Sequence, residues 1–193
     1  MNVGLFLFDD IELLDFAGPY EVFSIASEQE NNNLNVFTVT EHGNPIQTFN
    51  GLKVIPDYSF NNHPQIDILI IPGGQGTKTE MEKGAVLTWI NENFIKAKLT
   101  MSVCSGARIL GKLGLLDGIE STTHHEVMED MSAISPSTII RADKRFVHQG
   151  NILTAAGISA GIDASIYVVR KFFGNDTANE ALIIMEYGNW EDL

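Results

Sequence analysis

Apolar runs alternate with amphipathic patterns along the whole chain. Short hydrophobic runs predict buried strands, and apolar residues recurring every three or four positions predict helices. The expected strands are residues 2–8, 34–40, 66–71, 99–103, 119–123, 138–141, 145–148 and 151–155. The expected helices are residues 19–29, 83–97, 105–113, 124–131, 160–173 and 176–187, and residues 44–55 form a short ribbon around Asn50 and Gly51. This alternation predicts an α/β fold with a mostly parallel central sheet and helices on both faces.

Some of these helices carry specific local signals. Pro19 suits the first turn of the helix expected at 19–29. Thr177 and Glu180 have the spacing of a capping box at the start of the last helix. In the helix expected at 83–97, the apolar residues near one face are Val86, Leu87, Ile90, Phe94 and Ile95.

Composition narrows the class of protein. The chain has 193 residues, of which 44% are hydrophobic, and 12 Lys and Arg stand against 25 Asp and Glu, a formal net charge of −13. This length fits a single domain, residues 1–193. The acidic balance argues against binding to nucleic acid, which needs clustered basic residues. No apolar run approaches the roughly 18–20 residues of a membrane span, so no membrane partner is expected.

The single cysteine and the first residues suggest a compartment. One cysteine excludes an internal disulfide and any metal site built from several cysteines. The start of the chain, MNVGLFLFDD, lacks the basic residues of a signal peptide. A reducing, cytoplasmic location is therefore expected.

Three segments should meet at one edge of the sheet. Residues 8–18, 72–77 and 104–107 each follow an expected strand. Open parallel sheets bind ligands at the carboxyl ends of their strands, so we expect these segments to lie together around a small-molecule site.

Cys104 is the sharpest chemical feature. It stands between an apolar strand and an expected helix, and Ser105, Gly106 and Ala107 follow it. Small neighbours permit a tight strand-to-helix turn like the nucleophile elbow of hydrolases. A helix N-terminus favours thiolate over thiol, which would make Cys104 nucleophilic. A buried core cysteine is the alternative, since free cysteines are commonly buried.

Asp15 is a candidate partner for this cysteine. It lies in an apolar stretch, where burial of a carboxylate is costly unless the group is neutralised. An ionised Asp15 beside Cys104 would disfavour thiolate, whereas a protonated Asp15 could donate a hydrogen bond to it and act as a general acid. The alternative role for Asp15 is to cap the following helix.

Two glycines after the strand at 66–71 are candidates for positioning substrate. Gly73 and Gly74 let backbone N–H groups approach a ligand closely. One of these groups, with the N–H of Ser105, can form an oxyanion hole. The alternative is a plain glycine-rich loop.

Further pocket candidates come from the second half of the chain. His124 and His125 follow an expected strand and can reach the site, although either ring can equally be structural. Gly157 and Ile158 precede a helix, where small residues line a pocket or allow tight packing. The sequence after His125 lacks the second histidine of a zinc-protease motif, so a zinc protease is not expected.

Together these motifs resemble a known family. VCSG at 103–106, PGG at 72–74 and LLDFAGPYEVF at 13–23 are similar to the ThiJ/PfpI superfamily, and the resemblance runs from about residue 2 to 190. TTHH at 122–125 and GNILTAAGISAGID at 150–163 are most similar to the isonitrile hydratase branch and to related domains of AraC-type regulators. The resemblance implies a flavodoxin-like three-layer sandwich and a homodimer.

The resemblance also implies site residues, with two departures. It implies a nucleophilic cysteine at Cys104 paired with an acidic residue, which is Asp in the hydratase branch and matches Asp15. Ser105 stands where that branch has Thr, and His125 where it has an aromatic residue. The peptidase branch has His directly after the cysteine, so Ser105 argues against a peptidase.

The function implied is that of a lyase. Isonitrile hydratases convert an isonitrile and water to an N-substituted formamide, here through a thioimidate on Cys104 with no cofactor. Two alternatives remain open. One is a glyoxalase or deglycase acting on reactive aldehydes, and the other is a redox or stress sensor, or a ligand-binding module, without turnover.

Overall fold

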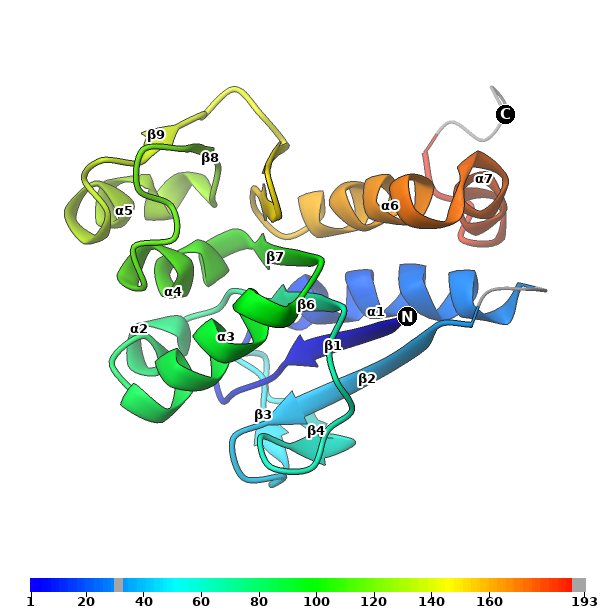
Figure 1. The fold of residues 1–193 in the computed structure, drawn as a ribbon, viewed down its shortest axis with the longest axis horizontal. Helices are drawn as coiled ribbons and strands as arrows, with labels where there is room; N and C mark the ends of the chain where they lie inside the picture. The colour runs from blue at the N-terminus through cyan, green and yellow to red at the C-terminus, as the bar shows by residue number, and fades with distance from the viewer. Residues whose placement is uncertain (30–32, 189–193) are drawn as a thin grey trace.

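A seven-stranded sheet forms the centre of the molecule (Figure 1). The computed structural model describes residues 1–29 and 33–188. The strand order is β10-β11-β7-β6-β1-β2-β5, and every neighbouring pair is parallel except β10 and β11. The strands are β1 (Asn2–Phe6), β2 (Asn35–Thr40), β5 (Tyr58–Ser59), β6 (Ile68–Ile71), β7 (Leu99–Val103), β10 (Phe146–Gln149) and β11 (Ile152–Ala155). The expected mostly parallel sheet is confirmed.

Two small ribbons stand apart from this sheet. The strands β3 (Ile46–Gln47) and β4 (Lys53–Val54) pair antiparallel, as the Asn50–Gly51 turn predicts. The strands β8 (Glu120–Ser121) and β9 (Ile139–Ile140) pair in parallel.

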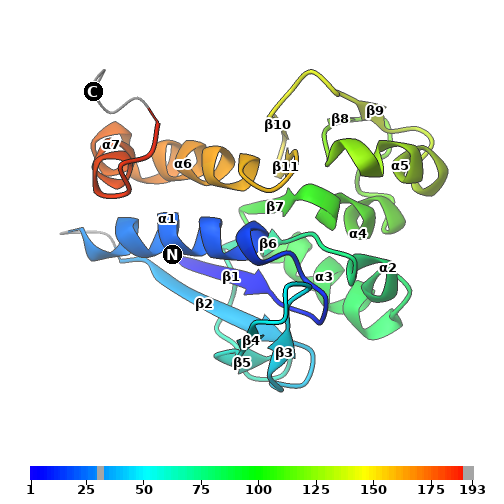
Figure 2. The same cartoon turned by 180° about the vertical axis from the view of Figure 1, so that it is seen from behind.

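Helices cover both faces of the sheet, so the expected three-layer α/β sandwich is confirmed. The helices α1 (Leu13–Glu28), α6 (Ala160–Phe173) and α7 (Asn175–Ile184) pack against one another. The helix α3 (Gly84–Lys96) lies on the opposite face from α1, as the front and back views show (Figures 1 and 2). The shorter helices are α2 (Thr77–Glu80), α4 (Ala107–Lys112) and α5 (Met128–Ile134), with short 3-10 helices at Cys104–Gly106 and His125–Val127.

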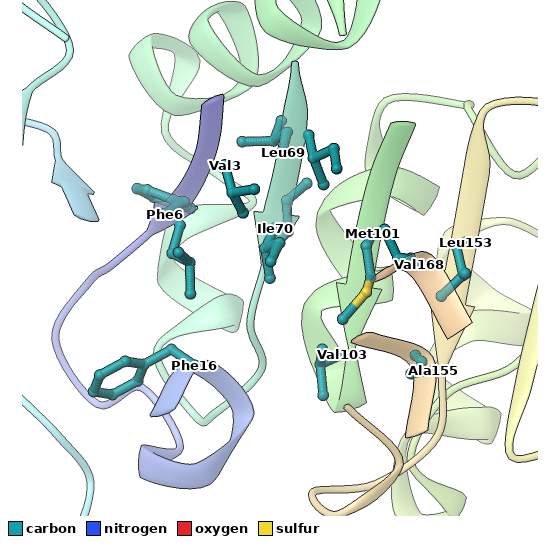
Figure 3. Close-up of a cluster of buried hydrophobic side chains, with 14 of the residues drawn as sticks. Val3, Phe6, Phe16, Leu69, Ile70, Met101, Val103, Leu153, Ala155 and Val168 are labelled. Carbon is teal, nitrogen blue, oxygen red and sulfur yellow. The ribbon is translucent and has the colours of Figure 1, made fainter. Parts of the chain in front are cut away.

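The central strands are hydrophobic on both faces because helices cover both. All five residues of β7 and all four of β6 are buried. Figure 3 shows Ile70 and Met101 on these strands, with Phe16 of α1 and Val168 of α6 among the side chains of the same core. This rigid core fixes where the carboxyl ends of β1, β6 and β7 lie.

The first helix begins earlier than the sequence pattern indicated. It starts at Leu13 rather than at residue 19, so Pro19 lies inside it and Asp15 in its first turn. Packing against α6 accounts for this, because Gly18 and Pro19 meet the residues Ile162 and Gly161. A tertiary contact here overrides the preference of proline for a helix start.

Other local expectations were also wrong. The last helix begins at Asn175, so Thr177 lies within it and donates to the Phe173 carbonyl at 3.1 Å instead of forming a capping box. Ile95 is 72% exposed, whereas Ile90 on the same helix is fully buried. The short elements β5 and α2 had no predicted counterpart. Within residues 1–29 and 33–188, no helix is long and apolar enough to cross a membrane.

The contrast between Ile90 and Ile95 gives a test of the layer that α3 forms. Ile90→Ala leaves a cavity beneath α3 and is expected to lower the free energy of unfolding by about 2–5 kcal/mol. Ile95→Ala is the matched control and is expected to change it by less than about 0.5 kcal/mol. Urea denaturation of both variants measures this, and equal losses would contradict the placement of α3.

Candidate functional site

A strained turn presents Cys104 at the end of β7. Its φ is +55°, in the left-handed region that non-glycine residues rarely adopt. Gly106 is required here, because a Cβ at that position would lie 2.1 Å from the carbonyl oxygen of Ile71. The Cys104 N–H donates to the Ala156 carbonyl at 3.0 Å, and its carbonyl accepts from the Thr123 hydroxyl at 2.7 Å. The turn is therefore held from both neighbouring segments.

Asp15 is fully buried beside this cysteine. The N–H of Gly73 donates to its Oδ2 at 3.0 Å, while Oδ1 has no hydrogen-bond partner in the described residues. The Cys104 thiol also interacts with this carboxyl and lowers its pKa. Burial has the larger effect and raises the pKa of Asp15 to about 7, so the interactions with Gly73 and Cys104 only partly offset it.

The same burial acts on the thiol. Desolvation, followed by the negative charge of Asp15, raises the pKa of Cys104 to about 12. The backbone N–H groups of Ser105 and Ile158 act in the opposite direction and lower the pKa of the thiol. The resting site at neutral pH therefore holds a thiol, which differs from the expectation that the helix terminus alone would give thiolate. Asp15 and Cys104 titrate as a coupled pair.

The backbone amides of the glycine-rich loop hold the site together, although Gly74 also lines the pocket. The Gly74 N–H donates to the Ser105 hydroxyl oxygen at 2.8 Å, and that hydroxyl donates to the Gly74 carbonyl at 3.1 Å. With the Gly73 N–H on Asp15, both loop amides are engaged. A Cβ on Gly73 would lie 2.6 Å from the Ser105 nitrogen, so the loop must carry glycine there. The backbone N–H groups that lower the pKa of the thiol belong to Ser105 and Ile158 instead.

The two histidines occupy different positions. His124 lines the pocket at Cys104, and its Nδ1 accepts from the Glu126 N–H at 3.3 Å. His125 is exposed and is not among the pocket-lining residues, which corrects its assignment to the pocket. The two rings pack with centroids 4.3 Å apart. Gly157 does not line the pocket either; it lies against the His124 ring, where a Cβ would come within 2.2 Å.

The pocket that opens at the thiol has a volume of about 440 Å³. Its lining residues are Glu12, Phe49, Gly74, Gln75, Lys78, Cys104, Ser105, Arg108, His124, Glu126, Val127, Asp130 and Ile158. The sequence analysis missed Arg108, although its position four residues after Cys104 in a helical segment was a usable signal. Within residues 1–29 and 33–188, no group of three His, Cys, Asp or Glu residues is arranged to hold a metal ion.

The segments expected to meet at the sheet edge do meet. The first turn of α1, which follows β1, meets the loop after β6 and the turn after β7 through the hydrogen bonds of Asp15, Gly73, Gly74 and Ser105. This arrangement accompanies a match to the model of the DJ-1/PfpI family over residues 1–171. The chain belongs to the DJ-1/PfpI family.

Relatives within the DJ-1/PfpI family differ in what they do. The isonitrile hydratase of Pseudomonas putida is 32% identical over 190 residues, covering 97% of this chain and 78% of that protein. The HTH-type transcriptional regulator GbdR of Pseudomonas aeruginosa is 24% identical over 176 residues, or 91% of this chain. The chain spans about half of that regulator, since the match covers 47% of it.

A solved structure agrees with the fold. A ThiJ/PfpI family protein from Pseudomonas syringae superposes with a TM-score of 0.87 at 26% identity. The superposition covers 96% of this chain and 74% of that protein.

The raised pKa of Asp15 predicts a pH-dependent stability. The folded chain holds this proton up to about pH 7 and the unfolded chain only to about pH 4. The stability due to the buried neutral carboxyl is therefore present below pH 4 and lost as pH rises to 7. Asp15→Asn removes the titration, so its free energy of unfolding relative to wild type should rise by about 2–3 kcal/mol from pH 5 to pH 8.

Urea denaturation at the two pH values measures this difference. Asp176→Asn, an exposed carboxylate of α7, is the control and should follow wild type. Parallel profiles for wild type and Asp15→Asn would contradict a raised pKa.

Proposed function

We propose that this protein is an isonitrile hydratase, which adds water to an isonitrile to give an N-substituted formamide. The observation that carries the proposal is the buried Asp15 carboxyl, which is electrostatically coupled to the Cys104 thiol at the base of an open pocket. Similarity to the Pseudomonas putida isonitrile hydratase over 97% of the chain supports the choice of reaction.

The first step forms a covalent intermediate. The sulfur of Cys104 attacks the terminal isonitrile carbon as the ionised Asp15 accepts the thiol proton, and the new S–C bond makes a thioimidate. Asp15 then delivers that proton to the same carbon. Proton transfer between the two side chains lets a thiol with a high pKa act as a nucleophile without a free thiolate at rest.

The second step releases the formamide. Asp15, ionised again, accepts a proton from water as the oxygen adds to the thioimidate carbon, and it passes that proton to the substrate nitrogen. The C–S bond then breaks as the carbonyl forms, and the proton of the new hydroxyl group passes to the sulfur. One isonitrile and one water give one formamide, and the pair regains its single proton.

The backbone supports charge on the sulfur. The backbone N–H groups of Ser105 and Ile158 lower the pKa of the thiol, so they stabilise negative charge as the proton leaves. Ile158 has a φ of +36°, an unfavourable conformation for a β-branched residue, so the backbone beside the thiol is strained. Gly73 and Gly74 act indirectly, by holding Asp15 and Ser105.

A turnover assay with p-nitrophenyl isocyanide tests the mechanism. Cys104→Ala is expected to abolish formamide formation, and Asp15→Asn to lower kcat by about 10²–10⁴-fold, the usual contribution of a general acid–base group. The wild-type rate should rise with pH through about 7, as Asp15 loses its proton and becomes able to accept that of the thiol.

Asp176→Asn is the control and should keep the wild-type rate, because its carboxylate lies on α7. Full turnover by Cys104→Ala would refute the covalent route. A wild-type protein that binds isonitriles without converting them would instead favour a ligand-binding module, as the partial match to a transcriptional regulator suggests. Lactate formation from methylglyoxal would favour the aldehyde alternative.

A further inference from the structure

A buried arginine lies beside the nucleophile. Arg108 is only 5% exposed and lines the same pocket as Cys104, one turn further along the chain. Its Nη1 donates to the Thr77 hydroxyl at 3.1 Å, and its Nη2 pairs with the carboxylate of Asp130. Its Nε is buried and has no hydrogen-bond partner in the described residues. A buried guanidinium that leaves one N–H unsatisfied is costly.

Arg141 provides a comparison within the same molecule, because it forms a complete two-bond pair with a carboxylate. Arg141 binds Asp143 with both atoms of one edge, Nε to Oδ1 and Nη2 to Oδ2, each at 3.0 Å. In Arg108 the equivalent edge is half used, because Asp130 reaches Nη2 only. The planar fork of arginine fits both oxygens of one carboxylate, so this edge is an incompletely filled carboxylate receptor.

The Asp130 side chain can move away from Arg108 more easily than Arg108 can leave its buried position. The Asp130 side chain is 45% exposed, so moving it into water costs little solvation. Arg108 cannot follow, since its side chain is 6% exposed and is also held by Thr77. A ligand carboxylate that enters the pocket therefore competes with Asp130 for Nη2 and can in addition satisfy Nε.

The other charges that line the pocket do not select for a carboxylate ligand. Lys78 adds a positive charge to the lining, and Glu12 and Glu126 add negative ones. The summed charge therefore does not favour an anion, and recognition has to come from the geometry of the arginine fork.

We propose that Arg108 binds a carboxylate of the substrate, displacing Asp130, so that the pocket takes small electrophiles that carry a carboxylate near the reacting carbon. The identity of the reacting group, an isonitrile, rests on the proposed function, whereas the carboxylate site does not. Arg108 is thus a specificity-determining residue, and Asp130 is an internal stand-in for the substrate carboxylate.

Calorimetry with two product-like probes tests the site without turnover. N-formylglycine carries the carboxylate, and N-formylglycine methyl ester lacks its charge. Wild type is expected to bind the acid about tenfold more tightly than the ester, the effect of one charge-assisted pair. Asp130→Asn removes the competing carboxylate and should raise the affinity for the acid by about a further tenfold with the ester unchanged.

Matched variants make the result specific. Glu129→Gln changes the neighbouring exposed carboxylate on the same helix and should behave as wild type. Arg108→Lys keeps a charge but lacks the fork, so the preference for the acid should fall to less than about twofold. If Arg108→Lys does not fold, the binding of the acid by Asp130→Asn tests the proposal by itself. The Asp130 side chain is half-exposed, so this variant is expected to fold. The proposal would be overturned if wild type bound the acid and the ester equally, or if Asp130→Asn showed no gain in affinity for the acid. It would also be overturned if neither wild type nor Asp130→Asn bound the probes.

Turnover separates this proposal from the proposed function. Wild type should convert isocyanoacetate with a kcat/KM about tenfold above that of its methyl ester, the ratio that one charge-assisted pair provides. Carboxylate-selective binding without hydration of either compound would refute the hydratase and leave the Arg108 site standing. Hydration of both compounds at equal rates, with no selectivity in binding, would refute the Arg108 site alone.

Discussion

The burial of the Asp15 carboxyl against the Cys104 thiol is the constraint on which the site depends. Two acidic groups lie close together and are largely removed from water, so neither ionises at its ordinary pKa. A proton held between them is ready for transfer to and from a reacting carbon. The fold provides this arrangement by placing the start of α1, the loop after β6 and the turn after β7 at one edge of a rigid sheet.

The segments around this pair tolerate little change. Ile11 pairs with Gly74, whose φ is +125° and where a Cβ would lie 2.4 Å from the Asp10 carbonyl oxygen. Gly76 is equally confined, with a Cβ position 2.0 Å from the carbonyl oxygen of Asp9. These close backbone approaches bring the loop after β6 against the end of β1. The glycines of the loop are therefore needed for close packing around the site. The positive φ angles of Cys104 and Ile158 instead occur at residues that take part in the proposed chemistry.

Much of the fold follows from the sequence, because the buried strands and long helices have strong periodicity. The elbow of small residues and the carboxylate in an apolar run made Cys104 and Asp15 candidates, and the resemblance to the ThiJ/PfpI superfamily implied that they pair. The protonation of the pair does not, because it depends on how deeply the fold buries both groups. The start of α1 was missed since packing of Gly18 and Pro19 on α6 decides it.

The pocket wall was harder to predict than its base. Which of two adjacent histidines faces the pocket depends on the turn after β8, and the structure selects His124. Arg108 was missed because a basic residue in a short helix usually faces solvent. Its burial depends on Asp130 and Thr77, which lie on two other helices, and neither partner is marked by local sequence.

The most direct test is an infrared titration of the S–H stretch of the protein without substrate. The chain has one cysteine, so the band reports Cys104 alone. The account predicts that wild type keeps the band well above pH 9, the ordinary pKa of a thiol, and that Asp15→Asn loses it at a lower pH than wild type. Loss of the band below pH 8 in wild type would show a resting thiolate and would contradict the conclusion that the site holds a thiol at neutral pH.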